Sequence, residues 1–233
     1  VYHKVTCANF PEEVLPEEET AQLILAPMST AATGDFAAVM AKASMVYGDI
    51  DAEFAKTCLK AAKKAYEYLE ETVSGSGYRN PDDIVTGEYP DGRDVDERFF
   101  AACELYKATG DKKYHKAIKE TTFITLPRGL GWASVGMYGI VEYLSLEDKD
   151  EEVAEVLTQM LKEQAEKAEE EAASDGYSCT LGDTYPWGSN MSVANNGMLL
   201  LFASDLVGTD TAGLAGLQLD YILGRTDIQN LSK

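Results

Sequence analysis

The sequence is poor in the residues that build metal and redox sites. It has two histidines and four cysteines among 233 residues. The cysteines Cys7, Cys58, Cys103 and Cys179 lie far apart and form no CxxC or Cys/His pattern, which excludes a zinc ribbon and a CxxC redox motif. We interpret Cys58 and Cys103 as small apolar side chains buried on helices. Their wide spacing leaves the disulfide state, and with it the redox compartment, open.

The two histidines offer little for metal binding. His115 lies in the polar stretch KKYHKAIK, and we interpret it as a solvated side chain. His3 lies in an extended opening segment, and as a metal ligand it would need partners upstream of it. Because the sequence shows no such partner, we favour a role for His3 without a metal.

The chain also lacks long apolar runs and an excess of basic residues. No run approaches the roughly 20 apolar residues of a membrane span. Forty acidic residues against 20 basic ones give a formal net charge of −20, which repels nucleic acid and anionic lipid alike. We therefore expect no nucleic-acid or membrane partner and interpret the acidity as a solvated surface.

The absence of GxSxG, of a phosphate-cradling glycine loop and of HExxH argues against serine hydrolases, kinases and zincins.

Strand-like alternation is almost absent, and helical periodicity dominates. Residues 1–30 are expected to form an irregular lead-in, because their prolines exclude a long helix. Residues 31–225 predict an all-α domain of stacked helical hairpins, and we expect residues 1–233 to form a single domain. The four expected hairpins span residues 33–71, 96–120, 131–171 and 189–224. The loops between them, at 74–93, 121–131 and 174–190, are expected to gather at one end of the helices and to carry the site.

Aromatic residues are frequent in those loops. Trp187, Tyr185 and Tyr177 share one loop, and Tyr78 and Tyr89 share another. Trp187 stands among proline, glycine, serine and asparagine, directly before a run that is typical of a buried helix. Sugar rings present apolar C–H faces, so this pattern predicts an aromatic platform for a glycan. The alternative is that each aromatic ring pins its own loop to the helices, which we favour for the individual tyrosines but not for Trp187.

Acidic residues concentrate in the stretch GEYPDGRDVDERFFAACELY. They are Glu88, Asp91, Asp94, Asp96, Glu97 and Glu104. The adjacent pair Asp96 and Glu97 falls near a helix start and allows three interpretations. The pair could favour the helix dipole, bind a hard cation such as calcium together with backbone carbonyls, or serve as acid and base.

Several blocks, in order along the chain, resemble a known family. They are YHKVTCANFPEEVLPEEET, STAATGDFAAVMAKAS, DAEFAKTCLKAAKKAYEYL, DIVTGEYPDGRDVDERFFAACELYKATGD, GWASVGMYG, YPWGSNMSVANNGMLLLFASDL and LDYILGR. They resemble the middle of the catalytic domain of glycoside hydrolase family nine, the endo-β-1,4-glucanases and related cellulases. The resemblance runs from Tyr2 to Arg225.

The resemblance implies a fold and a reaction. The fold would be an (α/α)6-barrel-type toroid of antiparallel helical hairpins, here incomplete with about four of the six hairpins. The reaction would be hydrolysis of internal β-1,4-glucosidic bonds with inversion, which needs two carboxyl groups roughly 6.5 to 9.5 Å apart. In the family the base belongs to a DAGD stretch before the position of Tyr2, and the acid to a block after the position of Arg225. We therefore expect no catalytic residue in this chain and no hydrolysis by it alone.

The resemblance also assigns binding residues. It implies that Trp187 and Tyr89 line the sugar cleft, and Tyr185 joins them as a substrate-binding residue. Asp96 and Glu97 match a pair that resembles calcium ligands in some family members. No cofactor is required beyond such a structural calcium ion.

The expected partner is β-glucan or a cello-oligosaccharide. The parent protein is expected to be extracellular or at the cell surface, because an insoluble polysaccharide cannot enter a cell. Two alternatives stay open: a non-catalytic glycan-binding module, and a helical-scaffold interaction module. The second would leave an apolar patch open and would self-associate through it.

Overall fold

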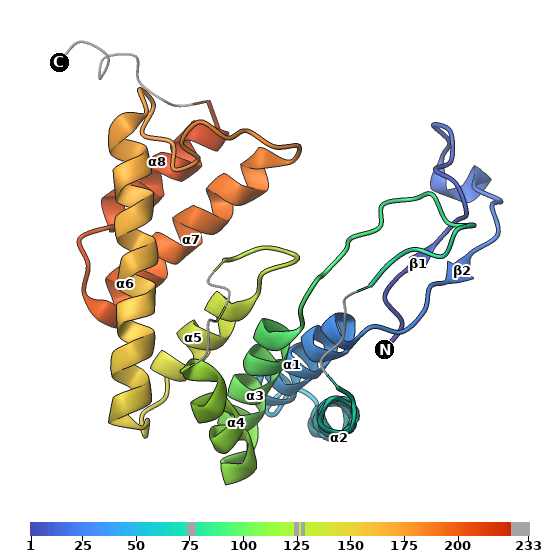
Figure 1. The fold of residues 1–233 in the computed structure, drawn as a ribbon, viewed down its shortest axis with the longest axis horizontal. Helices are drawn as coiled ribbons and strands as arrows, with labels where there is room; N and C mark the ends of the chain where they lie inside the picture. Colours follow the sequence, from blue (N-terminus) through green and yellow to red (C-terminus); the bar gives the residue numbers. More distant parts are fainter. Residues whose placement is uncertain (74–77, 124–125, 127–128, 225–233) are drawn as a thin grey trace. The chain divides into compact units, whose positions relative to one another are not determined.

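The protein is all-α apart from one small sheet. The computed structural model describes residues 1–73, 78–123, 126 and 129–224. The helices are α1 (Thr30–Val46), α2 (Ala52–Glu71), α3 (Val95–Thr109), α4 (Lys112–Thr122), α5 (Gly136–Leu144), α6 (Glu151–Ser174), α7 (Ser189–Val207) and α8 (Ala212–Ile222) (Figure 1). Each odd-numbered helix contacts the helix that follows it, so the four predicted hairpins and the all-α class are confirmed. None of these helices is both long and apolar enough to cross a bilayer.

The chain divides into two compact units, Val1–Leu126 and Pro127–Lys233, and each is described by itself. Compact units can belong to one domain, so a single domain over residues 1–233 stays a prediction. The expected loops at 74–93 and 121–131 fall partly outside the described residues, which leave out 74–77, 124–125 and 127–128. A common end for the three loops also stays a prediction.

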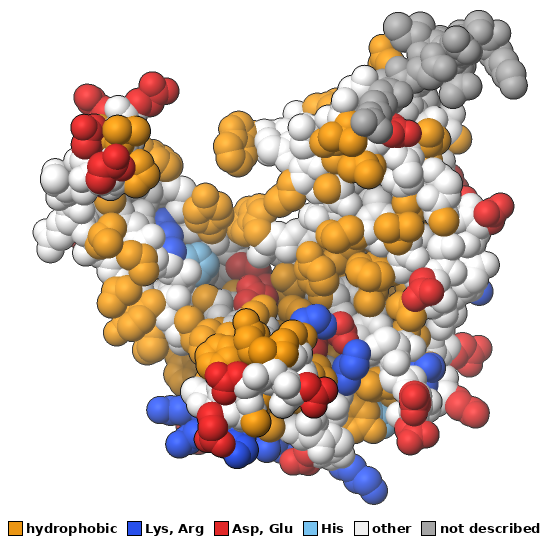
Figure 2. All heavy atoms as spheres, turned by 180° about the vertical axis from the view of Figure 1, so that it is seen from behind, with side chains coloured by type: hydrophobic (Ala, Val, Ile, Leu, Met, Phe, Trp, Pro, Cys, Tyr) orange, Lys and Arg blue, Asp and Glu red, His pale blue; other side chains and the backbone are white. Residues whose placement is uncertain are grey.

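The lead-in of the first unit is a two-stranded arm. Strand β1 (Val5–Thr6) pairs antiparallel with β2 (Ile24–Leu25), and a short 3-10 turn at Pro16–Glu18 lies between them. The expectation of an irregular segment was therefore only partly right, because β-branched residues extend the chain on either side of the proline-rich turn. Figure 2 shows acidic side chains gathered at the tip of this arm.

The arm lies against the loop between α2 and α3. The Val85 backbone N–H donates to the Ala8 carbonyl at 2.8 Å, and the hydroxyls of Thr6 and Thr86 lie 2.6 Å apart. These contacts join residues about 80 positions apart in sequence. The loop that carries Tyr89 is therefore supported by the lead-in.

Helix α1 is the centre of the first unit, because it packs against both α2 and α3. It begins at Ser29, whose hydroxyl accepts from the Ala32 N–H at 3.1 Å. Its buried residues are small: Ala31, Thr33, Gly34, Ala37, Ala38 and Ala41. At Gly34 a Cβ would stand 2.5 Å from the Cβ of Glu97 on α3, so only glycine fits there. Small side chains thus let the two helix backbones approach closely.

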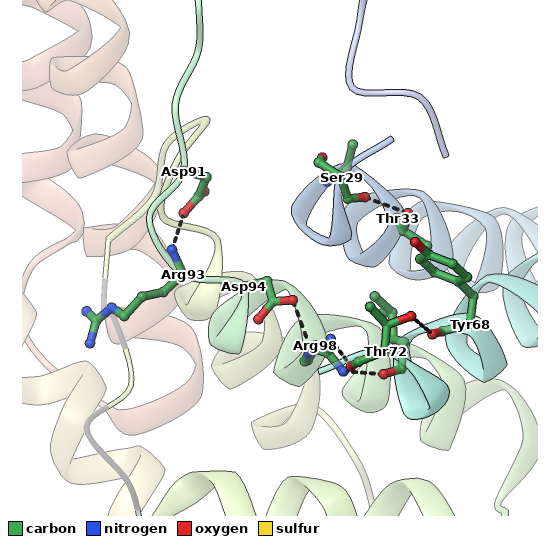
Figure 3. Close-up of polar contacts among 10 residues, drawn as sticks. Ser29, Thr33, Tyr68, Thr72, Asp91, Arg93, Asp94 and Arg98 are labelled. Carbon is green, nitrogen blue, oxygen red and sulfur yellow. Dashed lines mark hydrogen bonds and ion pairs between the residues drawn. The ribbon is translucent and has the colours of Figure 1, made fainter. Parts of the chain in front are cut away.

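Arg98 joins the end of α2 to the start of α3. Its guanidinium donates to the carbonyls of Leu69 at 2.5 Å and Thr72 at 2.9 Å, and its Nε donates to the Asp94 carboxylate at 3.0 Å (Figure 3). The Leu69 carbonyl also accepts the Thr72 N–H at 3.2 Å, which closes the end of α2. Arg98 thus contacts two carbonyls at the end of α2 and pairs with the buried Asp94 carboxylate at the same time.

Two sequence interpretations of side chains are settled in this unit. Cys58 and Cys103 are buried on α2 and α3, as predicted, and neither forms a disulfide. The interpretation of His115 as merely solvated was wrong. Its ring packs against Tyr106 with centroids 5.0 Å apart, because residues on neighbouring helices α3 and α4 face each other there.

The second unit is built on α6. This helix begins at Asp150, whose carboxylate accepts from the Val153 N–H at 3.2 Å, and it contacts α5 and α7. Its buried residues follow one face: Val153, Leu157, Met160, Leu161, Ala165, Ala168 and Ala172. Helix α7 ends at Gly208, whose φ of 73° belongs to the left-handed region, and α8 then packs back on α7.

We expect Arg98→Leu to lower the free energy of unfolding by about 3 kcal/mol, because it removes the cation from a buried pair and two carbonyl contacts. Chemical denaturation followed by circular dichroism measures this loss. Lys56→Met is the control, since it deletes the cation of the exposed Lys56–Glu53 pair and should change stability by less than about 0.5 kcal/mol. Equal effects of the two substitutions would contradict the role given to Arg98.

Candidate functional site

The loop between α6 and α7 presents Trp187 to solvent. The side chain of Trp187 is 100% exposed, and α7 begins two residues later, after Gly188 with a φ of 76°. A fully exposed indole does not pin its loop to the helices, which removes the alternative raised for this residue. The exposed indole is therefore accessible to a ligand, and its flat apolar face is of the kind that stacks on a sugar ring.

Asp175 organises the first half of this loop. One carboxylate oxygen accepts the backbone N–H groups of Tyr177 at 2.8 Å and Cys179 at 3.0 Å. The other oxygen accepts the hydroxyl of Tyr185 at 3.4 Å. Burial, together with Cys179 and Asp175, raises the pKa of Tyr185 to about 12. The Tyr185 ring is half exposed, so it lies on the same loop as Trp187 with its hydroxyl turned toward Asp175.

Gln218 on α8 fixes the same first half of the loop. Its amide oxygen accepts from the Thr180 N–H and hydroxyl, both at 3.0 Å, and its amide nitrogen donates to the Ser178 carbonyl at 2.8 Å. Gln218 is 1% exposed, so these bonds are made away from water. Asn196 on α7 also donates to the Thr180 carbonyl at 3.1 Å. Buried polar groups with satisfied partners hold a loop in one conformation, and this loop carries Trp187.

In the first unit, His3 and Tyr78 form a stacked pair beside Tyr89. The two rings are 3.7 Å apart at their centroids and tilted by 8°. His3 Nε2 lies 3.1 Å from the Tyr89 carbonyl and Nδ1 lies 2.9 Å from the Ser29 hydroxyl. Tyr78 is buried and pins its loop, whereas Tyr89 is 57% exposed with a φ of 50°. Burial lowers the pKa of His3, which favours the neutral ring in this contact.

The acidic stretch is largely buried. Asp94, Asp96, Glu97 and Glu104 are each at most 2% exposed. Glu104 pairs with Lys42 at 2.8 Å. Carboxyl groups buried in this way cannot reach a glycosidic bond, so the structure disfavours the acid and base interpretation of Asp96 and Glu97.

Glu97 is the most unusual group of this stretch. Both of its carboxylate oxygens are buried without a hydrogen-bond partner among the described residues. Burial and the neighbouring Asp96 and Asp91 raise its pKa to about 10. Burial and the same two aspartates raise the pKa of Asp35 to about 7. No group of three or more histidine, cysteine, aspartate or glutamate side chains is arranged for a metal ion in the described parts of the chain.

The structure places the predicted residues in two groups. Trp187 and Tyr185 share one loop of the second unit, whereas Tyr89, Asp96 and Glu97 belong to the first unit. Sequence analysis missed the supports of these loops, chiefly Gln218 and the stacked His3. The available signal for Gln218 was a single amide in an otherwise apolar helical run, GLAGLQL.

Comparison with solved structures defines the class of protein. A single-mutant thermostable endoglucanase from Alicyclobacillus acidocaldarius matches 97% of this chain with a TM-score of 0.91 and 34% identity, and the match covers 44% of that chain. An endoglucanase from the termite Nasutitermes takasagoensis, at 21% identity and a TM-score of 0.71, shares the fold. The fold is therefore that of the (α/α)6 glycoside hydrolases, of which this chain spans a part.

Sequence comparison gives the family. Residues 4–230 match the family described as Glycosyl hydrolase family 9, and the chain belongs to this family of cellulase-type hydrolases. Endoglucanase D of Acetivibrio thermocellus is 30% identical over 97% of this chain and 37% of its own length. A xyloglucan-specific endo-beta-1,4-glucanase of Bacteroides ovatus is 34% identical over 97% of this chain and 41% of its own length. The chain thus spans less than half the length of these relatives.

Proposed function

We propose that this chain binds β-1,4-glucan through Trp187, as part of an enzyme that cuts internal bonds of such glucans with inversion. The observation that carries the proposal is the full exposure of Trp187 on a loop held by buried hydrogen bonds. The apolar face of a pyranose ring stacks on an indole, and a fixed loop lowers the entropy lost on binding. Tyr185 on the same loop extends the platform. Tyr89, exposed in the first unit, is proposed as a further contact.

We propose that the catalytic acid and base of the parent enzyme lie outside this chain. Inverting hydrolysis needs two accessible carboxyl groups with room for a water molecule between them. Four carboxyl groups of the acidic stretch, those of Asp94, Asp96, Glu97 and Glu104, are buried, and hydrogen bonds from Asn80 and Arg79 lower the pKa of Glu88. A carboxyl group with a lowered pKa is a poor general acid. The parent is proposed to act outside the cell, where a polymeric glucan is found.

We expect Trp187→Ala to weaken the binding of cellotetraose at least about tenfold, because it removes the apolar platform. Isothermal titration calorimetry measures the affinity. Trp132→Ala is the matched control, since Trp132 is the only other tryptophan, is 52% exposed and lies in the same unit. Unchanged affinity of Trp187→Ala would refute the proposal.

The unchanged chain is expected to release no reducing sugar from soluble β-glucan, because it is proposed to lack the catalytic acid and base. Clear turnover in a reducing-sugar assay would contradict this proposal.

We also propose a structural calcium ion at Asp96 and Glu97. Two buried Glu97 oxygens without a hydrogen bond are costly for a folded protein and are suitable ligands for a hard cation. Because the described side chains offer no cluster of three acidic ligands, backbone carbonyls of the preceding turn would complete the coordination. The cation would then offset the burial of the two carboxylates.

If calcium binds there, saturating Ca²⁺ should raise the melting temperature by about 5 °C relative to EDTA. The response should grow with pH, since the raised pKa of Glu97 means that calcium must displace a proton. Glu97→Gln should abolish the response, and Glu104→Gln, a second buried glutamate of α3, should retain it. Equal melting temperatures in Ca²⁺ and EDTA would rule the site out.

A second candidate function is that of a self-associating helical scaffold. Apolar side chains on α7 and α8 stay exposed: Met198, Leu201, Leu217, Leu219 and Leu223. Exposed apolar patches mark interaction surfaces, and a second copy of the chain is the proposed occupant.

Sedimentation velocity over a wide concentration range tests this candidate. The chain should form dimers as its concentration rises, and Leu219→Lys should keep it monomeric. Val73→Lys, at an apolar residue of the first unit that is even more exposed (89% against 58% for Leu219), should leave the dimer intact. A monomer at every concentration would exclude the scaffold function.

A further inference from the structure

The second unit holds a pocket behind the Trp187 loop. Its volume is about 280 Å³, and its walls come from α6, from the loop before α7 and from the first turns of α7. Ala168, Leu181 and Leu199 line its apolar part. The Trp187 side chain does not line the pocket, but its neighbour Pro186 does, so the pocket lies next to the exposed platform on the same loop.

Polar side chains converge on the pocket from all three walls. Gln164 and Glu171 come from α6, Thr184 from the loop and Ser192 from α7. None of these four side chains has a hydrogen bond or ion pair with another residue in the described parts of the chain. Their donors and acceptors are therefore available to a ligand. A small set of convergent polar groups on an apolar wall is typical of small-molecule sites.

The walls of the pocket are fixed before any ligand arrives. Asn196 donates to the Thr180 carbonyl and to its hydroxyl, at 3.1 and 2.9 Å, and Thr180 is bound in turn to the buried Gln218. Gly182 has a φ of 58°, and a Cβ there would lie 2.1 Å from a carboxylate oxygen of Glu171. The left-handed backbone at this position favours glycine, and the end of the Glu171 side chain packs on the space that glycine leaves open. A preformed pocket costs little conformational entropy on binding.

The charges and the size select the ligand class. Lys167 and Glu171 contribute one charge of each sign to the rim, so the pocket has no net charge of its own. The protein as a whole carries −20, which disfavours anions. A volume of about 280 Å³ lies just below the roughly 300 to 1,000 Å³ of small-ligand sites, so the pocket suits at most a single ring. The uncharged donors and acceptors of the lining, on Gln164, Thr184 and Ser192, match the hydroxyl groups of a ligand.

We propose that this pocket binds one neutral pyranose, as a free monosaccharide or as the terminal unit of a glucan. The site goes beyond the proposed function, because it does not use Trp187 and needs no catalytic residue. Affinity for so small a ligand is expected to be on the order of millimolar.

Titration of the ¹⁵N-labelled full chain tests the site by chemical-shift changes. D-glucose should shift the backbone amides of residues 164–171, 180–184 and 192–196 in a saturable way. Glucuronate, the anionic analogue, should bind more weakly. A response to cellotetraose without a response to glucose assigns the pocket to the terminal unit of a chain, and a response to both assigns it to the free sugar as well. No shift of these amides with either sugar overturns the proposal.

Variants separate the pocket from the platform and from misfolding. Gln164→Ala should weaken glucose binding by about 2- to 10-fold, the effect of losing one hydrogen bond, whereas Gln159→Ala on the same helix should not. Ser192→Phe should fill the pocket and abolish the shifts. If this variant does not fold, Gln164→Ala decides alone.

Trp187→Ala should keep glucose binding, so that failure of the platform and failure of the pocket are distinguishable. Loss of glucose binding in Trp187→Ala, or equal losses in Gln164→Ala and Gln159→Ala, overturns the site.

Discussion

The close approach of α1 and α3 at Gly34 is the constraint on which the first unit depends. Because a Cβ at position 34 would overlap the Cβ of Glu97, the two backbones meet with no side chain between them. That contact buries the glutamate, and burial together with the neighbouring Asp96 and Asp91 raises its pKa. The packing of the helices thus contributes to the electrostatics of the acidic stretch, because a glycine on α1 allows the close approach that buries a carboxyl group on α3.

In the second unit the corresponding constraint is a buried amide, that of Gln218. Gln218 is fully surrounded, yet its oxygen and nitrogen are both engaged with the loop before α7. A satisfied polar group in a core costs little, and it fixes the one conformation in which its partners match. These bonds hold Ser178 and Thr180, and the exposed Trp187 follows further along the same loop. The same anchoring shapes the inner side of the loop as a pocket, so one set of hydrogen bonds serves two surfaces.

Helices could be predicted from the sequence because their signals are local. Asp51 and Asp150 cap α2 and α6 with their side chains, and apolar residues recur at helical spacing behind them. The two-residue strands at β1 and β2 were missed, since so short an extended segment has no measurable alternation and is held by a distant loop. The choice among roles for Glu97 was also out of reach, because burial depends on the partner helix and not on neighbouring residues. Gln218 was missed for the same reason: its role exists only through a loop about 40 residues away.

The acidity of the chain and its candidate sites fit together because the proposed ligands are neutral. Acidic side chains gather at the tip of the N-terminal arm, away from the Trp187 loop in sequence, and others, such as Glu163, Glu166 and Glu170, are exposed on α6. Stacking on an indole and hydrogen bonding to hydroxyl groups need no charge, so a net charge of −20 does not oppose them. The same charge repels anionic polymers and keeps a surface with exposed leucines in solution. Selection for a neutral polyhydroxylated ligand thus leaves the surface free to be acidic, whereas a phosphate-bearing ligand would have required the reverse.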